Sequence, residues 1–254
     1  MDRVTFGISE LDSALSGGLP KGNLVLLSGG AGTGKSTLCL HYLVSGALNG
    51  ERGLYISTEQ DPVELSRQCE NCGLDFKNQV EKDNVRVMMV DILKEEGWLQ
   101  KIREEVESFS PQRIVIDSLS TFSEYASATD IARDILIKRG GIPVRTIDEI
   151  APSSMSERTM VKRMLAMLMS EMKSFKATAL LTSELPEKGD SLSSDGVSEF
   201  LADGVITLYY LGIGSARFRT MQIRKMRYSS HEMQPISYSI TDRGIIVVKD
   251  KPFM

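Results

Sequence analysis

Cysteine is scarce in this sequence, which contains three among its 254 residues. So few cysteines fit a reducing compartment. Cys69 and Cys72 form a CxxC motif before Gly73, at the expected end of a helix, and no second pair of cysteine or histidine stands at metal-ligand spacing. A structural role is therefore the main interpretation of this motif, with metal or redox chemistry as the alternative.

Long apolar runs and an excess of positive charge are also missing. No apolar stretch approaches the roughly 18 residues that cross a bilayer, and the start Met1-Asp2-Arg3 lacks the apolar core of a signal peptide. We therefore expect a cytoplasmic protein without a membrane span. The net charge of −4 argues against a nucleic-acid surface over the whole body, while local basic patches remain open.

The sequence does contain enough apolar material for one large domain. With 41% hydrophobic and 25% charged residues, we expect residues 1–254 to form a single α/β domain. Apolar runs of strand length alternate with longer helical patterns, which predicts a mostly parallel, twisted sheet flanked by helices. The strand runs are Leu24 to Ser28, Gly53 to Ser57, Val85 to Val90, Arg113 to Asp117 and Thr178 to Thr182. The helical patterns lie near residues 35–48, 61–72, 94–108 and 155–174.

The pattern changes after residue 204, where strand-like runs follow one another without helices. These runs are Val205 to Leu211, Phe218 to Met226, Ile236 to Ile240 and Ile245 to Lys249, the last two joined by an Asp-Arg-Gly turn. We expect them to extend the sheet with antiparallel strands. Residues 123–154 have weak periodicity and several helix breakers, which predicts an insertion or a mobile loop.

A glycine-rich motif, GGAGTGKS, occupies Gly29 to Ser36 between a strand run and a helical pattern. It matches GxxxxGK[ST], in which glycines let backbone amides converge on an anion without Cβ atoms in the way. The helix start adds positive potential, Lys35 can reach the β and γ phosphates of ATP, and Ser36 can hold Mg²⁺ through its hydroxyl. A merely glycine-rich turn is the alternative. The expected nucleotide contacts are Gly30, Ala31, Gly32, Thr33, Gly34, Lys35, Ser36 and Thr37.

Two carboxylates follow strand runs that end at the same edge of the predicted sheet. Asp117 ends the buried run RIVID, where Mg²⁺ beside the phosphates would be its partner, as in a Walker-B motif. Glu59 follows the run LYIST, and we expect it to orient and activate the attacking water. The alternatives are caps: Asp117 for the helix after it, and Glu59 or Asp61 for the helix that begins at Pro62.

Segments along nearly all of the chain are similar to one family. They are TFGISELDSALSGGLPKGNLVLLSGGAGTGKST, YISTEQDP, VIDS, LLTSE, GVSEFLADGVITLYY and KMRYSSH. The chain resembles the KaiC-like branch of RecA-superfamily P-loop ATPases, with a single KaiC-type domain of the kind common in archaea. The resemblance implies a RecA-like fold and a homo-oligomeric, hexameric ring in which each nucleotide is touched by the next subunit. It places neighbour contacts on Lys225, Met226, Arg227, His231, Thr241 and Asp242, and a contact within the same subunit on Asn71.

Three features depart from the family's pattern. The family usually has two successive glutamates, and here the second is Gln60, a change that concerns the rate of hydrolysis more than its mechanism. Glu199 and Phe200 stand where a phosphorylated clock domain has adjacent Ser and Thr, so self-phosphorylation is not expected there. The separation of 67 residues between Asp117 and Glu184 (184 − 117) exceeds the typical one, which places an insertion in residues 123–154.

Basic residues gather near the C-terminus although the whole chain is acidic. Between residues 217 and 231 they are Arg217, Arg219, Arg224, Lys225 and Arg227, with no acid among them. In a strand, Lys225 and Arg227 share a face about 6.7 Å apart, a spacing that suits two cations on one triphosphate. The alternative is a solvated edge strand that its charges protect from aggregation.

Three functions are compatible with these features. The first is a ring-forming Mg²⁺-dependent ATPase with a regulatory or signalling role, ATP and ADP as ligands, and a protein partner that the sequence does not identify. The second is a DNA recombinase or helicase of the same superfamily, which the pI near 5.4 and the lack of a separate DNA-binding domain disfavour. The third is an ATP-sensing scaffold with little turnover, an alternative that Gln60 supports.

Overall fold

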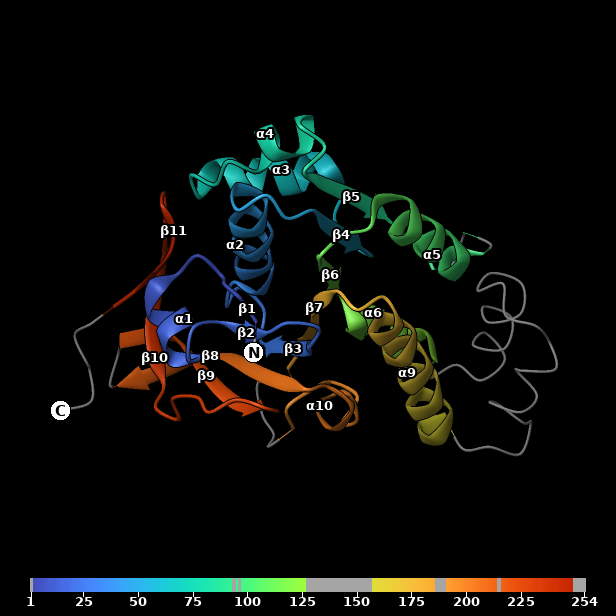
Figure 1. Cartoon of the computed structure of the whole chain (residues 1–254). Helices are drawn as coiled ribbons and strands as arrows, with labels where there is room; N and C mark the ends of the chain where they lie inside the picture. The colour runs from blue at the N-terminus through green and yellow to red at the C-terminus, as the bar shows by residue number, and fades with distance from the viewer. Residues whose placement is uncertain are drawn as a thin grey trace.

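The computed structural model describes residues 2–92, 95, 97–126, 157–185, 191–213 and 216–248 (Figure 1). The strands are β1 (Arg3–Val4), β2 (Leu19–Pro20), β3 (Leu24–Gly29), β4 (Gly53–Ser57), β5 (Val85–Met89), β6 (Arg113–Asp117), β7 (Thr178–Glu184), β8 (Gly204–Ile213), β9 (Ala216–Met226), β10 (Ile236–Thr241) and β11 (Gly244–Val247). The helices are α1 (Ser9–Ala14), α2 (Lys35–Leu48), α3 (Pro62–Asn71), α4 (Phe76–Glu81), α5 (Trp98–Phe109), α6 (Leu119–Ala126), α9 (Glu157–Ser174) and α10 (Ser198–Leu201). Among the described helices, none is long and apolar enough to cross a membrane.

A nine-stranded sheet, in the order β11-β10-β9-β8-β3-β7-β6-β4-β5, forms the centre of the fold. The six strands from β8 to β5 in this order pair in parallel, whereas β9, β10 and β11 are added antiparallel. The predicted parallel sheet with an antiparallel C-terminal extension is therefore confirmed. One part of the expectation is corrected, because β8, the run from Val205 to Leu211, lies parallel to β3 and only the strands after it are antiparallel.

Two apolar layers cover the two faces of this sheet. Alternate residues of β3 show the division: Leu24 and Leu26 pack with α5, α6 and α9, whereas Val25 and Leu27 pack with α1, α2 and α3. All four are at most 2% exposed, as the period of two in a strand buried on both faces requires. Met169 and Met172 of α9 are buried in the first layer.

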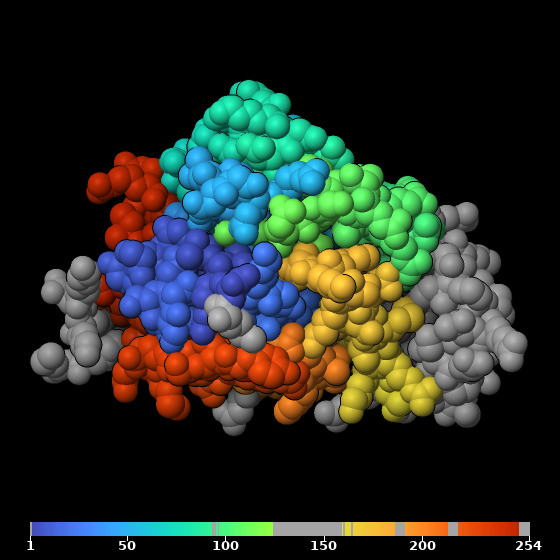
Figure 2. All heavy atoms as spheres, viewed as in Figure 1, coloured from blue at the N-terminus to red at the C-terminus, as the bar shows by residue number. Residues whose placement is uncertain are grey.

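The N-terminal segment packs against the C-terminal strands, far from it in sequence (Figure 2). Arg3 donates to the Ser229 hydroxyl at 2.7 Å, and the Glu232 amide donates to the Ala14 carbonyl at 2.8 Å. The predicted insertion at 123–154 starts within α6, and residues 127–154 lie outside the described part of the chain.

A buried arginine ties the N-terminal segment, α2 and the sheet together. The Arg113 guanidinium pairs with Glu51 at 2.6 Å and donates to the carbonyls of Thr5 and Tyr42, each at 2.6 Å. Its side chain is only 3% exposed. A Cβ at Gly46 of α2 would lie 2.3 Å from Arg113 Nε, so glycine is needed there to admit the guanidinium.

We predict that Arg113→Met lowers the free energy of unfolding by about 3 to 5 kcal/mol, because it leaves the Glu51 carboxylate and two carbonyls without their donor. Arg86 is the matched control, since it forms ion pairs with Asp83 and Glu105 but its side chain is 37% exposed. Arg86→Met should cost less than about 1 kcal/mol. Urea unfolding of both variants measures the difference, and equal losses would contradict this role of Arg113.

Candidate nucleotide-binding site

The glycine-rich loop joins the end of β3 at Gly29 to the start of α2 at Lys35. Gly32 and Gly34 have φ angles of 72° and 99°, values that glycine adopts readily. A Cβ at Gly34 would also lie 2.6 Å from Ile240 Cδ1, so the loop packs closely against β10. The loop borders a cavity of about 370 Å³. Its lining residues are Ala31, Gly32, Gly34, Lys35, Ser36, Thr37, Ser57, Glu59, Gln60, Gln68, Asp117, Ser118, Glu184 and Ile240.

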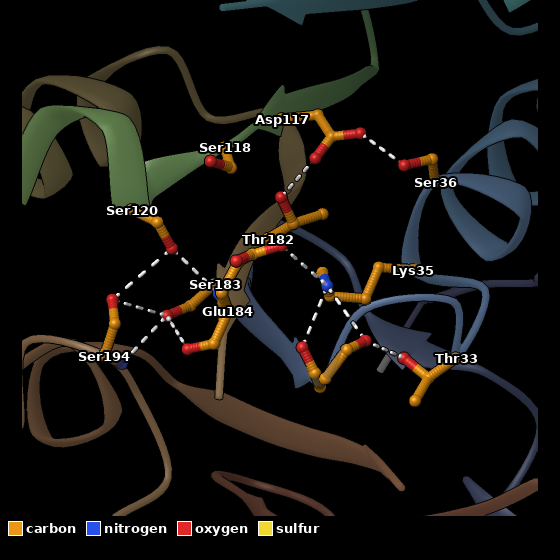
Figure 3. A network of polar contacts seen from close by, with 12 residues as sticks. Thr33, Lys35, Ser36, Asp117, Ser118, Ser120, Thr182, Ser183, Glu184 and Ser194 are labelled. Atoms are coloured by element: carbon orange, nitrogen blue, oxygen red, sulfur yellow. Dashed lines mark hydrogen bonds and ion pairs between the residues drawn. The ribbon is translucent and has the colours of Figure 1, made fainter. Parts of the chain in front are cut away.

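Lys35 is held at the floor of this cavity by its own loop (Figure 3). Its ammonium donates to the carbonyls of Gly29 and Gly30 at 2.8 and 3.3 Å, and it lies 3.7 Å from a carboxylate oxygen of Glu184. The Lys35 side chain is 10% exposed and that of Glu184 is 59% exposed. An anion in the cavity would therefore meet a cation that is already placed, with an exposed carboxylate as its competitor.

Asp117 accepts hydrogen bonds from three hydroxyl groups, and Figure 3 shows those of Ser36 and Thr182. Ser36 of α2 and Tyr55 of β4 donate to Oδ2 at 2.7 and 2.5 Å, and Thr182 of β7 donates to Oδ1 at 2.5 Å. Burial, and then the charge of Asp117, raise the pKa of the Tyr55 phenol well above its ordinary value. The Asp117 carboxylate thus lies at the cavity and accepts these three hydroxyls instead of capping α6.

Ser36 and Asp117 supply oxygen ligands of the kind that Mg²⁺ prefers. Their side chains are 2.7 Å apart at the cavity wall. Within the described residues, no group of three or more His, Cys, Asp or Glu could hold a metal by itself. The donor set fits Mg²⁺, which usually keeps several waters and takes one or two carboxylates together with phosphate oxygens.

Glu59 and Asp61 have separate roles in the structure. The Asp61 carboxylate accepts the amides of Val63 and Glu64, each at 2.8 Å, and forms a capping box at the start of α3. The Glu59 carboxylate instead accepts the hydroxyls of Ser118 and Thr121 at 3.0 and 3.1 Å and lines the cavity. The alternative of a cap therefore applies to Asp61, and Glu59 stays directed at the cavity.

Serine hydroxyls anchor the segment that begins at residue 191 beside the same site (Figure 3). The Ser194 hydroxyl lies 3.3 Å from those of Ser120 and Ser183, and the Glu184 amide donates to Ser120 at 2.8 Å. The end of β7, which carries Glu184 next to Lys35, is thus fixed to α6 and to the segment leading into α10.

The turn between β10 and β11 lies beside the glycine-rich loop of its own chain, Gly29 to Ser36, which we call the P-loop. Tyr238 of β10 donates to the Thr33 carbonyl at 2.5 Å. A Cβ on Gly73, just beyond α3, would lie 2.3 Å from the Asp242 carbonyl oxygen. Asp242, and Thr241 before it, therefore lie beside the segment that follows α3 in the same chain. The resemblance had grouped these two residues with the contacts of a neighbour.

Lys225 near the end of β9 and Arg227 just after it lie toward the opposite edge of the sheet, whereas Arg219, earlier in β9, donates to the Gly32 carbonyl of the glycine-rich loop at 3.2 Å. Lys225 pairs with Val205, which pairs with Leu26 of β3, so Lys225 lies three residues, or about 10 Å, before the level of Gly29 where the glycine-rich loop begins. The Lys225 ammonium donates to the carbonyls of Glu199, Phe200 and Ala202, and the Arg227 guanidinium donates to Phe200 and to Asp203. Met226 lies between them and is 6% exposed, and His231 contacts the Glu232 carbonyl in the loop that follows. Lys225, Met226 and Arg227 are therefore not brought to the cavity of their own chain.

The CxxC motif has no partner group for metal binding among the described residues, and its thiols are free and buried. Burial raises the pKa of the Cys69 thiol to about 12, which keeps it protonated and unreactive. The structural interpretation of this motif is the one that fits.

Some polar groups at the site were not anticipated from the sequence. Tyr55 stood in an apolar run, and Ser118 and Thr121 stood at an expected helix start. The Gln68 amide donates to Thr37 at 3.1 Å across the cavity wall, although its place in the amphipathic helix α3 gave no signal. Their roles depend on which strands are neighbours, and that information is not local in sequence.

Comparisons with known proteins agree with this fold. The family model described as "ATPase: KaiC" matches residues 4–140 and 136–252. A UPF0273 protein of Aeropyrum pernix is 30% identical over 99% of this chain and 95% of its own length, and one of Pyrococcus furiosus is 28% identical over 98% and 95%. The circadian clock oscillator protein KaiC of Parasynechococcus marenigrum is 23% identical over 97% of this chain but 45% of its own length. The crystal structure of a KaiC-like protein of Pyrococcus horikoshii superposes with a TM-score of 0.77 at 28% identity, covering 97% of this chain and 99% of that one. The RecA-like fold and the single KaiC domain are thereby confirmed.

The pairing of Arg227 with Asp203 gives stability that depends on pH. Burial alone would raise the pKa of Asp203, but Lys173, the Leu24 amide and Arg227 all donate to its carboxylate and lower the pKa below its ordinary value of 3.8. A carboxyl with a lowered pKa in the folded state stabilises the protein above its unfolded pKa, and this contribution disappears as pH falls through the folded value.

We predict that Asp203→Asn lowers the free energy of unfolding by roughly 2 kcal/mol at pH 6, where the charged hydrogen bonds are complete. The deficit should shrink as pH falls below about 3.8, since the wild-type carboxyl then also loses its charge. Urea unfolding at a series of pH values measures it. Curves that remain parallel down to the lowest pH would contradict this assignment.

Proposed function

This chain belongs to the KaiC family of P-loop ATPases, and from that membership we propose that it binds ATP with Mg²⁺ in the cavity beside α2 and hydrolyses it as a single ATPase domain. One observation carries the proposal: Lys35, Ser36, Asp117 and Glu59 line the same cavity of about 370 Å³, where α2 begins and β6 ends. A phosphate-binding loop, a cation, a metal-ligating pair and a carboxylate for water are the parts that phosphoryl transfer to water requires.

Residues of the loop and of α2 bind the triphosphate in this proposal. The backbone amides of the loop and the start of α2 receive the phosphates, and Lys35 exchanges Glu184 for the β and γ phosphate oxygens. Ser36, through its hydroxyl, and Asp117 would hold Mg²⁺. The ion would neutralise charge that develops on the phosphate oxygens.

Glu59 orients the attacking water through the carboxylate oxygen that Ser118 and Thr121 leave available. The water oxygen forms a bond to the γ phosphorus while the bond from that phosphorus to the β–γ bridging oxygen breaks. ADP takes the bridging oxygen, inorganic phosphate leaves, and Glu59 accepts the proton that the water loses. Glu184 lies 3.7 Å from the Lys35 ammonium, where the γ phosphate would be sensed.

We place the protein in a homo-oligomeric ring, a hexamer, in which a second copy completes each site. The support is positional: Lys225 and Arg227 lie toward the sheet edge away from their own cavity, and the Arg227 side chain is 44% exposed. A cation so placed reaches a triphosphate only when that triphosphate belongs to a neighbour. Such a ring suits a cytoplasmic regulatory or signalling protein that reports its nucleotide state to a protein partner.

An ATP-sensing scaffold with little turnover is the second candidate, and Gln60 favours it. The backbone amide of Gln60 donates to the Ser57 hydroxyl at 2.9 Å, and Gln60 lines the cavity next to Glu59. A neutral side chain therefore stands where the family usually has a second glutamate. Single-turnover hydrolysis separates the two candidates, since ATP that stays intact for many hours would favour the scaffold.

We predict that Lys35→Ala weakens ATP binding and lowers the rate of hydrolysis by about 100-fold or more, which corresponds to about 2.7 kcal/mol of barrier. The reason is the loss of the one cation that the loop holds against the phosphates. Lys82→Ala, at an exposed position after α4, is the control and should resemble the wild type. Unchanged affinity and rate in Lys35→Ala would refute the site.

A mixing experiment tests the shared site. Arg227→Ala should lower the rate by about 10³ to 10⁵ while ATP still binds, and Glu59→Gln should be inactive because it no longer prepares the water. When the two inactive proteins are mixed equally, about a quarter of head-to-tail interfaces combine an intact Glu59 with an intact Arg227, so ATPase activity should return.

Arg224→Ala is the matched control for this experiment, because Arg224 is exposed on β9, three residues before Arg227, and contacts Gln222. It should keep an activity near that of the wild type. If the subunits exchange and the mixture of the two inactive variants stays inactive, Arg227 does not act on a neighbour's nucleotide.

A further inference from the structure

Two buried side chains that do not line the cavity donate hydrogen bonds to the Asp117 carboxylate. Tyr55 and Thr182 are both 0% exposed, and their hydroxyls donate to different oxygens of the carboxylate, Oδ2 and Oδ1, at 2.5 Å each. Ser36, the third donor, lines the cavity. Two donors therefore belong to the buried framework and one belongs to the site.

The strand register explains how these two hydroxyls reach the same carboxylate. On β7, Leu181 pairs with Ile116, so Thr182 lies level with Asp117 on the neighbouring strand. On β4, Tyr55 pairs with Val115, two residues before Asp117, and this offset of about 6.7 Å suits a side chain as long as tyrosine. Phenylalanine would fill the same space without reaching the carboxylate.

Two internal donors fix the plane of the carboxylate. A carboxylate has about four lone-pair directions, and one on each oxygen is taken by Tyr55 or Thr182. When Ser36 turns its hydroxyl to a cation, as the proposed function requires, the two buried donors remain. The other lone pairs then still face the cavity, and water has no route to replace donors that are fully enclosed.

We infer that Tyr55 and Thr182 are positioning residues that hold Asp117 in the orientation needed to bind the divalent cation of the nucleotide complex. This inference rests on the proposed function, and it adds two residues that touch neither nucleotide nor metal. Outer partners of this kind commonly change metal affinity by about 10- to 100-fold when they are removed.

The chain offers a matched control for the tyrosine. Tyr42 is also 0% exposed, and its hydroxyl donates to the Thr178 carbonyl at 2.7 Å, away from the cavity. Tyr42→Phe and Tyr55→Phe each remove one buried hydroxyl and one hydrogen bond. They differ in that only Tyr55 contacts Asp117.

The test is binding of Mn²⁺ to the complex of the full chain with ADP, measured by the loss of the free Mn²⁺ signal in electron paramagnetic resonance. Tyr55→Phe and, independently, Thr182→Val should weaken Mn²⁺ binding by about 10-fold or more. Tyr42→Phe should match the wild type. Affinity for ADP in EDTA should stay within about twofold in all of these proteins, because the loop and Lys35 are unchanged.

Each result has a defined meaning. Equal Mn²⁺ affinities in wild type, Tyr55→Phe and Thr182→Val would overturn the inference and leave the proposed function standing. Equal losses in Tyr55→Phe and Tyr42→Phe would also overturn it for the tyrosine, since the effect would then come from the core. Wild type that binds ADP without any Mn²⁺ site would overturn the metal site and this inference together. If Tyr55→Phe does not fold, Thr182→Val decides, and an unchanged Mn²⁺ affinity in it would overturn the inference.

Discussion

The parallel register of four neighbouring strands brings the functional groups of this protein together. Gly29 at the end of β3 pairs with Glu184 at the end of β7, and Asp117 at the end of β6 pairs with Ser57 at the end of β4. Because parallel strands end at a common edge, side chains that are up to 155 residues apart (184 − 29) meet around one cavity. A shift of one residue in any of these pairings would turn Asp117 or Thr182 to the other face of the sheet.

The antiparallel extension of the sheet sends a second set of charges to the other edge. β9 runs back from the level of the P-loop, so its last residues lie near the start of β3. At this level the Leu24 amide donates a hydrogen bond to Asp203. There Lys225 is fixed on carbonyl oxygens around α10 and Arg227 on Asp203. A phosphate-binding loop therefore lies at one edge and anchored cations lie at the other. A head-to-tail assembly of copies would bring the cations of one copy to the loop of the next.

Sequence patterns were sufficient where the signal is local. The limits of β4, β6 and α2 agree with the predicted ones, because each is a continuous apolar run or a strong helical period between clear breakers. Short elements such as α1, α4 and α10 were not predicted, since six or fewer residues carry too little periodicity. The parallel orientation of β8 was missed because strand direction depends on a partner, β3, about 180 residues earlier. The contact between Tyr55 and Asp117 was missed for the same reason, as 62 residues separate them and only the register between β4 and β6 makes them neighbours.

The partners of two largely buried carboxylates, Asp203 and Asp117, indicate which one has a structural role and which one is suited to bind a metal ion. Asp203 is paired with two cations, Lys173 and Arg227, so its charge is compensated within the protein and serves to join strands and helices. Asp117 is surrounded instead by neutral hydroxyls, which satisfy its hydrogen-bonding capacity and fix its orientation but do not cancel its charge. Enclosing an uncompensated charge is costly, and the cost is reduced when a cation from solution completes the site. A carboxylate held only by neutral donors at the wall of a cavity is therefore suited to attract a metal ion, whereas one held by lysine and arginine is not.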